Sequence, residues 1–389
     1  MRLPKTSPCV VVGGGAVGLS AAYHLARAGM KGVVLLERDL LGQGSTGACM
    51  GGIRLDFSTE VNVRFSLAAQ PRWEGFAEEF GVDPGFRRVG YLMLAADEER
   101  WAALQDARAL HARLGVRTEL LAPAEIRARW PHLETGGLLG GTFCAADGCA
   151  GPQEVIQGYA KRCRELGVRI LQETPALAIR IEGARVRAVE TPHGAVETGH
   201  VLCCAGPWAA QVGRMAGAEI PVKPIRRQVF VTGPVPSLPR EMPFTIDLSQ
   251  AATYKPEGEG FILYGPQDAE PSFSLKVDWE AAEWAVERAV RRVPAFAGAS
   301  ILRGWAGLYE ISPDNHGIMG GFEGLEGFHA ATGFSGHGFQ HSPVIGQAMA
   351  ERILEGEARV VDIRPLAPGR FARGALIPER LAAHHAEAG

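Results

Sequence analysis

The chain has 389 residues, of which 46% are hydrophobic and 21% charged, and its formal net charge is −3. This composition is that of a globular protein of about two domains, and the charge excludes the basic footprint of a nucleic-acid-binding or anionic-membrane-binding protein. No apolar run approaches the ~18 residues of a membrane span, and no signal sequence precedes the first apolar run. The seven cysteines stand in neither metal-binding nor disulfide spacing, so we expect small core residues in a reducing cytoplasm and no metal site.

The first ordered segment has the order strand, glycine-rich turn, helix. The apolar run Val10–Val12 ends at three glycines in G-x-G-x-x-G spacing, and an alanine-rich helical pattern runs from Ala16 to about Ala28. Gly13 permits the tight turn, Gly15 the close approach of a pyrophosphate, and Gly18 the close packing of helix on strand. The N-terminus of the helix adds free N–H groups and partial positive charge, which favour phosphate.

An acidic residue supports the same interpretation. A second apolar run, 33–36, ends on Glu37, about 20 residues after the glycines, where a carboxylate can bond the ribose hydroxyls of an adenosine. An acid there also disfavours the 2′-phosphate of NADP. The segment predicts a dinucleotide site and leaves FAD and NAD open; the alternative is a glycine-rich turn without a ligand.

A glycine-rich loop, GQGSTGACMGGIR, runs from Gly42 to Arg54. Its glycines indicate backbone that turns sharply or that another group approaches closely. In a dinucleotide-binding domain this loop follows the second strand, so we expect it to run over the cofactor. Arg54 at its end is suited to clamp a substrate carboxylate, although a solvated surface arginine explains the sequence equally well.

The chain then leaves the nucleotide domain for a block without a glycine fingerprint. We expect helices at 62–80, 98–114 and 124–130 and a strand at 90–94. A return begins at Asp147. It is expected to contain a helix at 152–166, a strand at 168–171, a hairpin at 176–190 and a strand at 200–204. The last strand runs into Ala205-Gly206-Pro207-Trp208, which predicts another close backbone approach to the cofactor.

The segment 221–299 has short alternating runs and frequent proline. We expect strands at 228–232, 252–255 and 261–264 and a helix at 279–293, which indicates an antiparallel sheet with a helix. We interpret it as part of a substrate domain.

The last organised section predicts a second loop that leads into a helix. A strand at 328–331 precedes a glycine-rich loop at 333–338, and Ser342-Pro343 has the signature of a helix start, with the helix running to about Leu354. A flavin, unlike a nicotinamide, needs a partner for the negative charge that develops at its N1–C2=O edge on reduction, and a helix N-terminus supplies it. We therefore favour FAD and assign residues 336–340 to the flavin end.

These motifs together resemble the D-amino-acid oxidase superfamily of flavoproteins, closest to the branch of sarcosine oxidase and the proline dehydrogenase β subunit. The resemblance covers nearly the whole chain and includes LCCAGPWA, AGLYEISPDNHGIMG and GFSGHGFQHSPVIG. It implies an α/β (overall α+β) fold with a discontinuous Rossmann-like FAD-binding domain and a substrate domain built on a mainly antiparallel sheet. The expected boundaries are 1–88, 147–220 and 301–389 for the FAD-binding domain, with the C-terminal tail, and 89–146 and 221–300 for the substrate domain.

The resemblance implies oxidation of a C–N bond in a small amino acid, and departures from the family pattern narrow the reaction. Tyr309 stands where the glycine and D-amino-acid oxidases have a carboxylate-binding arginine. Gly307 replaces the cysteine that tethers flavin in monomeric sarcosine oxidases, which implies non-covalent FAD. Gln340 replaces a lysine of those enzymes, and Ile262 stands near the position of an oxygen-activating lysine.

The first hypothesis is therefore an FAD-dependent oxidoreductase for a secondary amino acid such as sarcosine, an N-methyl amino acid or proline, with oxygen or an electron-accepting partner subunit as acceptor. The alternatives are a subunit that passes electrons to a partner, a D-amino-acid or glycine oxidase, and, least favoured, a flavoprotein that modifies RNA. The residues expected around the substrate are Arg54, Tyr254, Tyr309, His337 and Gln340; Tyr254 is equally explained as a strand aromatic, and His337 as a residue required by backbone geometry.

The cofactor residues that this interpretation assigns lie in or next to the four glycine-rich segments, apart from Gly307. They are Gly13, Gly15, Ala16, Val17, Gly18, Glu37, Arg38, Gly44, Ser45, Thr46, Met50, Gly51, Gly52, Ala205, Gly206, Trp208, Gly307, Gly333, Ser335, Gly336, His337, Gly338, Phe339 and Gln340.

Overall fold

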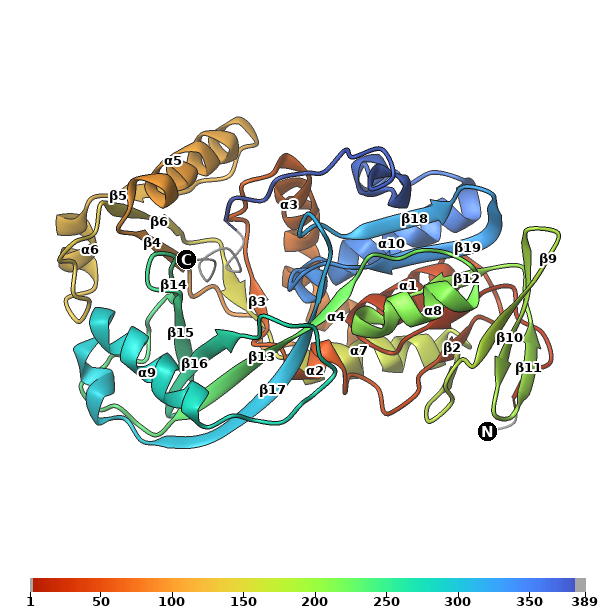
Figure 1. The fold of residues 1–389 in the computed structure, drawn as a ribbon, viewed down its shortest axis with the longest axis horizontal. Coiled ribbons are helices and arrows are strands. Elements are labelled where there is room, and N and C mark those ends of the chain that lie inside the picture. The colour runs from red at the N-terminus through yellow and green to blue at the C-terminus, as the bar shows by residue number, and fades with distance from the viewer. Residues whose placement is uncertain (1–2, 382–389) are drawn as a thin grey trace.

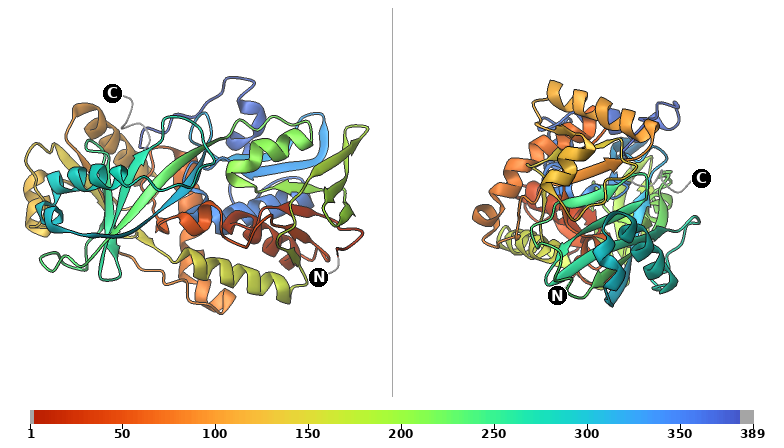
Figure 2. Two further views of the ribbon diagram at one scale, coloured as in Figure 1. Left: turned by 60° about the horizontal axis from the view of Figure 1, so that its bottom comes forward. Right: turned by 90° about the vertical axis from the view of Figure 1, so that its left-hand side faces the viewer.

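Two β-sheets organise the molecule, one in each lobe of an elongated structure (Figure 1). The computed structural model describes residues 3–381 of the chain. One sheet has nine strands and the other eight, and a two-stranded ribbon, β3 (Gly52–Ile53) with β7 (Gly148–Cys149), lies apart from them. The two lobes are also distinct in the turned view at the left of Figure 2.

The nine-stranded sheet has a parallel centre. Its order is β11-β10-β19-β12-β1-β2-β8, with β18 paired to β19 and β9 to β10. From β19 to β8 every pair is parallel, and the three residues of β1 and of β2 are fully buried, as expected for strands covered on both faces. The strands are β1 (Val10–Val12), β2 (Val34–Leu36), β8 (Arg169–Leu171), β9 (Ala178–Glu182), β10 (Arg185–Thr191), β11 (Gly194–Glu197), β12 (Val201–Cys203), β18 (Ile318–Phe322) and β19 (Leu325–Thr332).

Helices cover both faces of this sheet. Val11 of β1 packs into a core formed with α1 (Ala16–Arg27), α7 (Pro152–Glu165) and α10 (Gly338–Glu355), whereas Val10 packs into a core with α8 (Ala209–Met215). This is the alternation of a strand between two helical layers, and it confirms the Rossmann-like architecture.

The eight-stranded sheet is mainly antiparallel, as predicted. Its order is β17-β13-β16-β15-β14-β4-β6-β5, and the pair β14–β4 is parallel. In Figure 1 the long strands β13 and β17 run from this lobe to the middle of the molecule. The strands are β4 (Tyr91–Ala95), β5 (Glu119–Leu121), β6 (Gly140–Cys144), β13 (Lys223–Thr232), β14 (Phe244–Asp247), β15 (Ala252–Glu257), β16 (Gly260–Gln267) and β17 (Ile301–Ile311). Residues after 300 were expected in the FAD-binding domain. The strand β17 follows that boundary, yet it pairs with β13 in the eight-stranded sheet.

The remaining helices are α2 (Ser45–Ala48), α3 (Glu60–Glu74), α4 (Phe76–Phe80), α5 (Glu98–Arg113), α6 (Pro123–Arg129) and α9 (Glu280–Arg292). The single helix predicted at 62–80 is wrong, because Gly75 ends α3 and α4 begins after it. No helix of the described residues is long and apolar enough to cross a membrane.

The start predicted for the last helix is also wrong. The helix α10 begins at Gly338 rather than at Ser342, and Pro343 lies inside it. Proline removes one intrahelical hydrogen bond. Close packing of α10 on α1 compensates for this loss: the two helices approach so closely that a Cβ on Gly346 would lie 2.2 Å from Ser20 Oγ. The earlier start brings the N-terminus of α10 to the segment 336–340.

Candidate active site

A cavity of about 560 Å³ lies between the two lobes. Its floor is formed by the segments that follow the carboxyl ends of β1, β2 and β12 and by the N-terminus of α10. Parallel strands deliver such segments to one edge of the sheet, which is where ligands of open α/β sheets bind. Its opposite wall comes from the eight-stranded sheet, through residues of β13, β16 and β17.

The predicted cofactor residues meet in this cavity. All of those named above line it except Gly18 and Gly333. Gly18 lies under the turn, where a Cβ would come within 2.0 Å of Gly13 O, which is the close packing expected of it. Gly13 has φ +116°, and its Cβ would come within 2.3 Å of Cys204 O. A side chain at either position would collide with backbone.

The adenosine end is fixed by hydrogen bonds to loop residues. Glu37 Oε2 accepts a 2.7 Å bond from Gly14 N, and Oε1 accepts a 2.8 Å bond from Asp39 N. Thr46 Oγ1 accepts a 3.1 Å bond from Ala16 N in the first turn of α1. The guanidinium of Arg38 lies 3.7 Å from the ring centroid of Trp208. The glycine cradle, the carboxylate and the helix N-terminus fit the adenosine and pyrophosphate of FAD.

The N-terminus of α10 forms the other end of the floor. The helix begins after His337, and the residues from Ser335 to Gln340 line the cavity. Gly336 has φ +96°, and its missing side chain leaves room for the Tyr309 ring, which a Cβ would approach to 2.7 Å. The Gln340 side chain accepts a 2.9 Å bond from Arg54 N and therefore ties the helix to the loop after β3.

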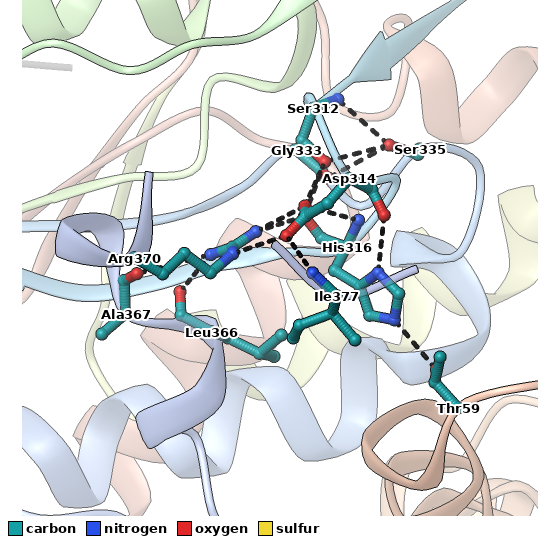
Figure 3. A network of polar contacts seen from close by, with 10 residues as sticks. All are labelled: Thr59, Ser312, Asp314, His316, Gly333, Ser335, Leu366, Ala367, Arg370 and Ile377. Carbon is teal, nitrogen blue, oxygen red and sulfur yellow. Dashed lines mark hydrogen bonds and ion pairs between the residues drawn. The ribbon is translucent and has the colours of Figure 1, made fainter. Parts of the chain in front are cut away.

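A buried polar network holds the loop before α10 (Figure 3). The Arg370 guanidinium makes bonds of 2.8 and 2.9 Å to the two carboxylate oxygens of Asp314. Ser312 Oγ donates a 2.7 Å bond to His316 O, and Ser312 N donates a 3.1 Å bond to Ser335 Oγ. The network thus joins a C-terminal segment to the glycine-rich loop at the cavity.

Glu310 supports the same loop and was missed from the sequence. Its carboxylate accepts a 2.8 Å bond from Thr332 Oγ1 and a 3.2 Å bond from Phe334 N, and it lines the cavity. Burial raises the pKa of this carboxyl group. Its position next to Tyr309 in the sequence could have indicated a role at the cavity.

Arg54, at the end of the glycine-rich loop, lines the cavity, and several acidic groups feel its charge. Its guanidinium lies 4.0 Å from the Phe57 ring centroid and donates to Asp56 O. Burial raises the pKa values of the Asp56 and Asp147 carboxyl groups, and the charge of Arg54 opposes both shifts. Burial also acts to raise the pKa of Glu379, but hydrogen bonds from Ser58 and the charge of Arg54 outweigh it and hold that pKa low.

Tyr254 is a correction. The tyrosine is fully buried in a cluster with Phe261 and Phe296, its ring lies 5.6 Å from that of Phe296, and it does not line the cavity. Its neighbour Thr253 does, because successive residues of β15 point to opposite faces of the sheet. The structure therefore places the hydroxyl of Tyr254 away from the other candidate residues.

Two residues that the sequence reading missed lie beside Tyr309. The hydroxyls of Tyr264 and Tyr309 are 3.1 Å apart, and the Arg227 guanidinium lies 5.4 and 5.5 Å from the two ring centroids. All three side chains line the cavity. Arg227 shares a face of β13 with Val229, so the alternation of that strand was the signal for it.

Comparison with known proteins gives a consistent picture. The family model described as FAD dependent oxidoreductase matches residues 9–352. Mitochondrial sarcosine dehydrogenase of Homo sapiens is 30% identical over 91% of the chain, which spans 40% of that protein. The chain thus spans less than half the length of such relatives.

Two other proteins match along at least nine tenths of their length. Sarcosine oxidase subunit beta of Rhodobacter capsulatus is 27% identical, with 97% of this chain and 92% of that protein covered. The crystal structure of L-proline dehydrogenase from P. horikoshii superposes with a TM-score of 0.90 and 32% identity, and it covers 96% of this chain and 100% of that one.

Proposed function

The chain belongs to the family of FAD dependent oxidoreductases, and from that premise we propose that it oxidises the C–N bond of a small secondary amino acid, such as sarcosine, another N-methyl amino acid or proline. FAD is the cofactor of this family. The observation that carries the proposal is Tyr309, which lines the substrate wall where glycine and D-amino-acid oxidases are expected to have arginine. The match to L-proline dehydrogenase along the whole chain supports it.

When bound, FAD supplies the acceptor at N5 for the hydride on the carbon next to nitrogen, and water hydrolyses the resulting imine, which from sarcosine gives glycine and formaldehyde. The residues from Gly336 to Gln340 would hold the flavin, since the N-terminus of α10 provides partial positive charge and N–H donors for its N1–C2=O edge. Gly307 offers no nucleophile at the position of the cysteine that tethers flavin in monomeric sarcosine oxidases, and we propose that FAD is held without a covalent link. Denaturation is expected to release yellow flavin.

The substrate carboxylate needs a cation, and beyond Arg38 at the adenosine end the cavity offers two arginines. Arg54 and Arg227 both line it, and either guanidinium group can pair with a carboxylate. His337, Tyr309 and Gln340 are proposed to complete the substrate end. The amine must reach the flavin as the neutral base, and the apolar surface of Val229, Phe244 and Ile246 in the same cavity favours the uncharged form.

A second candidate is a subunit that passes electrons to a partner rather than to oxygen. Ile262 and Gln340 favour it, because lysines are expected at those positions in enzymes that react fast with oxygen. The match to a protein named sarcosine oxidase subunit beta supports it too.

The proposed location of the protein is the cytoplasm.

Turnover by the purified chain tests both candidates. The substrates are sarcosine, L-proline, glycine and D-alanine, each with an artificial dye acceptor and with air. The proposal expects dye reduction with a secondary amino acid, and formaldehyde from sarcosine. Turnover confined to glycine or D-alanine would overturn it. Fast hydrogen peroxide release in air would remove the need for an electron-accepting partner.

A further inference from the structure

Three side chains from three neighbouring strands converge at the substrate wall. Arg227 on β13 pairs with Gly307 on β17, where a side chain would collide with Ala48, since a Cβ would come within 2.7 Å of the Ala48 Cβ. On the other side an irregularity in the pairing of β13 with β16 falls between Arg227 and Val229, and Val229 pairs with Tyr264. The guanidinium therefore lies among the rings of Tyr264 and Tyr309, 5.4 and 5.5 Å from their centroids.

The chemistry of this cluster suits an anion. Arg227 is 6% exposed and lines the cavity, so its guanidinium lies where little bulk water screens its charge. Burial raises the pKa of Tyr264 well above its usual value, so its hydroxyl stays protonated and can donate. A planar guanidinium beside two phenol hydroxyls that are 3.1 Å apart can bind both oxygens of a carboxylate.

Arg54 is the less suitable of the two arginines for this role. The acidic groups of Asp56, Asp147 and Glu379 feel its charge, and its Nη1 atom donates to the Asp56 carbonyl. A substrate carboxylate beside Arg54 would share that charge with the carboxylate of Glu379, whose pKa is held low.

The surface next to the cluster limits the rest of the ligand. The rings of Tyr91 and Phe244 stack, with 4.2 Å between their centroids and an interplanar angle of 12°. Both rings line the cavity, together with Val229 and Ile246. Such a wall accepts a methyl group or an aliphatic ring and offers no countercharge. One end of the chamber is therefore cationic and the adjacent wall is apolar.

We propose that Arg227, together with the hydroxyls of Tyr264 and Tyr309, binds the carboxylate of the substrate. In this arrangement the guanidinium comes from β13 instead of from the Tyr309 position on β17. The assignment rests on the proposed function in taking the substrate to be an amino acid with an aliphatic body.

The test is calorimetric titration of the FAD-loaded protein with two inert probes of one shape, pyrrole-2-carboxylate and pyrrole-2-carboxamide. Wild type binds the carboxylate more tightly than the amide. Arg227→Gln weakens carboxylate binding roughly 10- to 100-fold, the loss of a charge-assisted hydrogen-bonded pair, and leaves amide binding unchanged. Arg303→Gln, an exposed arginine on β17, is the matched control and changes neither affinity.

Two further variants keep the test decisive. Arg227→Lys retains the charge and should recover part of the preference for carboxylate. If Arg227→Gln does not retain FAD, the double variant Tyr264→Phe, Tyr309→Phe removes two donors and keeps the rings, and it should weaken carboxylate binding roughly 5- to 20-fold.

An unchanged ratio of carboxylate to amide affinity in Arg227→Gln overturns the assignment, as does loss of that ratio in Arg54→Gln alone. Failure of the proposed function looks different. In that case wild type and variants differ in carboxylate binding as expected, but wild type oxidises no secondary amino acid.

Discussion

The two ends of the cavity differ in whether backbone or side chains form them. The adenosine end consists of backbone and glycine, with Gly13 and Gly18 placed where any Cβ would meet a carbonyl oxygen within 2.3 and 2.0 Å. The substrate end consists of side chains on three strands, Arg227, Tyr264 and Tyr309. Substitutions at the first end should abolish assembly with the cofactor. Substitutions at the second should change the choice of substrate and leave the cofactor in place.

The largest expected effect is at the adenosine end. Gly18→Ala places a Cβ against Gly13 O. Because β1 and α1 would have to move apart to make room, the glycine-rich turn that receives the pyrophosphate would be distorted. We expect a protein without FAD, measured as visible flavin absorbance per mole of chain. Gly29→Ala is the control: Gly29 follows the same helix, and nothing lies within 4 Å of its Cβ, although its φ of +99° strains an alanine. It should cost about 1–2 kcal/mol in stability and retain FAD.

The next largest effect concerns the loop at the flavin end. Arg370→Met leaves Asp314 buried without its ion-pair partner, which should lower the free energy of unfolding by about 3–5 kcal/mol. Denaturant titration measures this. Arg364→Met breaks an exposed pair with Asp362 in the preceding turn and should leave stability unchanged. Equal behaviour of the two variants would show that the network of Figure 3 does not stabilise the loop.

The substrate end should respond in kinetics alone. Arg54→Gln is expected to raise KM for the secondary amino acid substrate about 5-fold, which is less than the effect of Arg227→Gln. The reason is that the charge of Arg54 already stabilises the buried carboxylate of Glu379. Tyr254→Phe should leave KM and kcat unchanged, because that hydroxyl lies outside the cavity, whereas Tyr264→Phe should raise KM. A large effect of Tyr254→Phe would return that residue to the site.

The last expected effect is a dependence of stability on pH that neither end of the cavity controls alone. Burial, with nearby arginines, lowers the pKa of His24 and of His341 to about 3, and burial lowers that of His329 to about 4. Folded pKa values below the unfolded value of ~6.5 mean that the unfolded chain binds more protons between these values. Stability is therefore complete above pH ~6.5 and falls as the pH drops, by up to about 1.4 kcal/mol per pH unit for each histidine.

Unfolding midpoints from pH 7 to pH 5 measure this slope. His24→Gln should make it shallower, because one of the three histidines no longer titrates. A slope that is unchanged in the variant would contradict the role of His24.

The contrast between the two ends also explains what could be predicted from the sequence. Backbone requirements leave a local mark, so the turn at Gly13–Gly18, Glu37 and the segment 336–340 could be placed from spacing alone. The β-strands and helices around them followed from periodicity. The start of α10 was misplaced because Ser342-Pro343 has a helix-start pattern that tertiary packing overrides.

The substrate end depends on pairing between distant strands, which no local pattern specifies. Arg227 and Tyr264 meet only because β13 pairs with β16 through an irregular register. Tyr254 was assigned by resemblance, and a single step in the alternation of β15 turns it into the core while Thr253 faces the cavity.

The most direct test of the account is anaerobic mixing of the FAD-loaded protein with sarcosine, L-proline, glycine and D-alanine, followed by the loss of visible flavin absorbance. The account predicts rapid bleaching by sarcosine or L-proline and none by glycine or D-alanine. Bleaching by glycine or D-alanine with none by the secondary amino acids would contradict it.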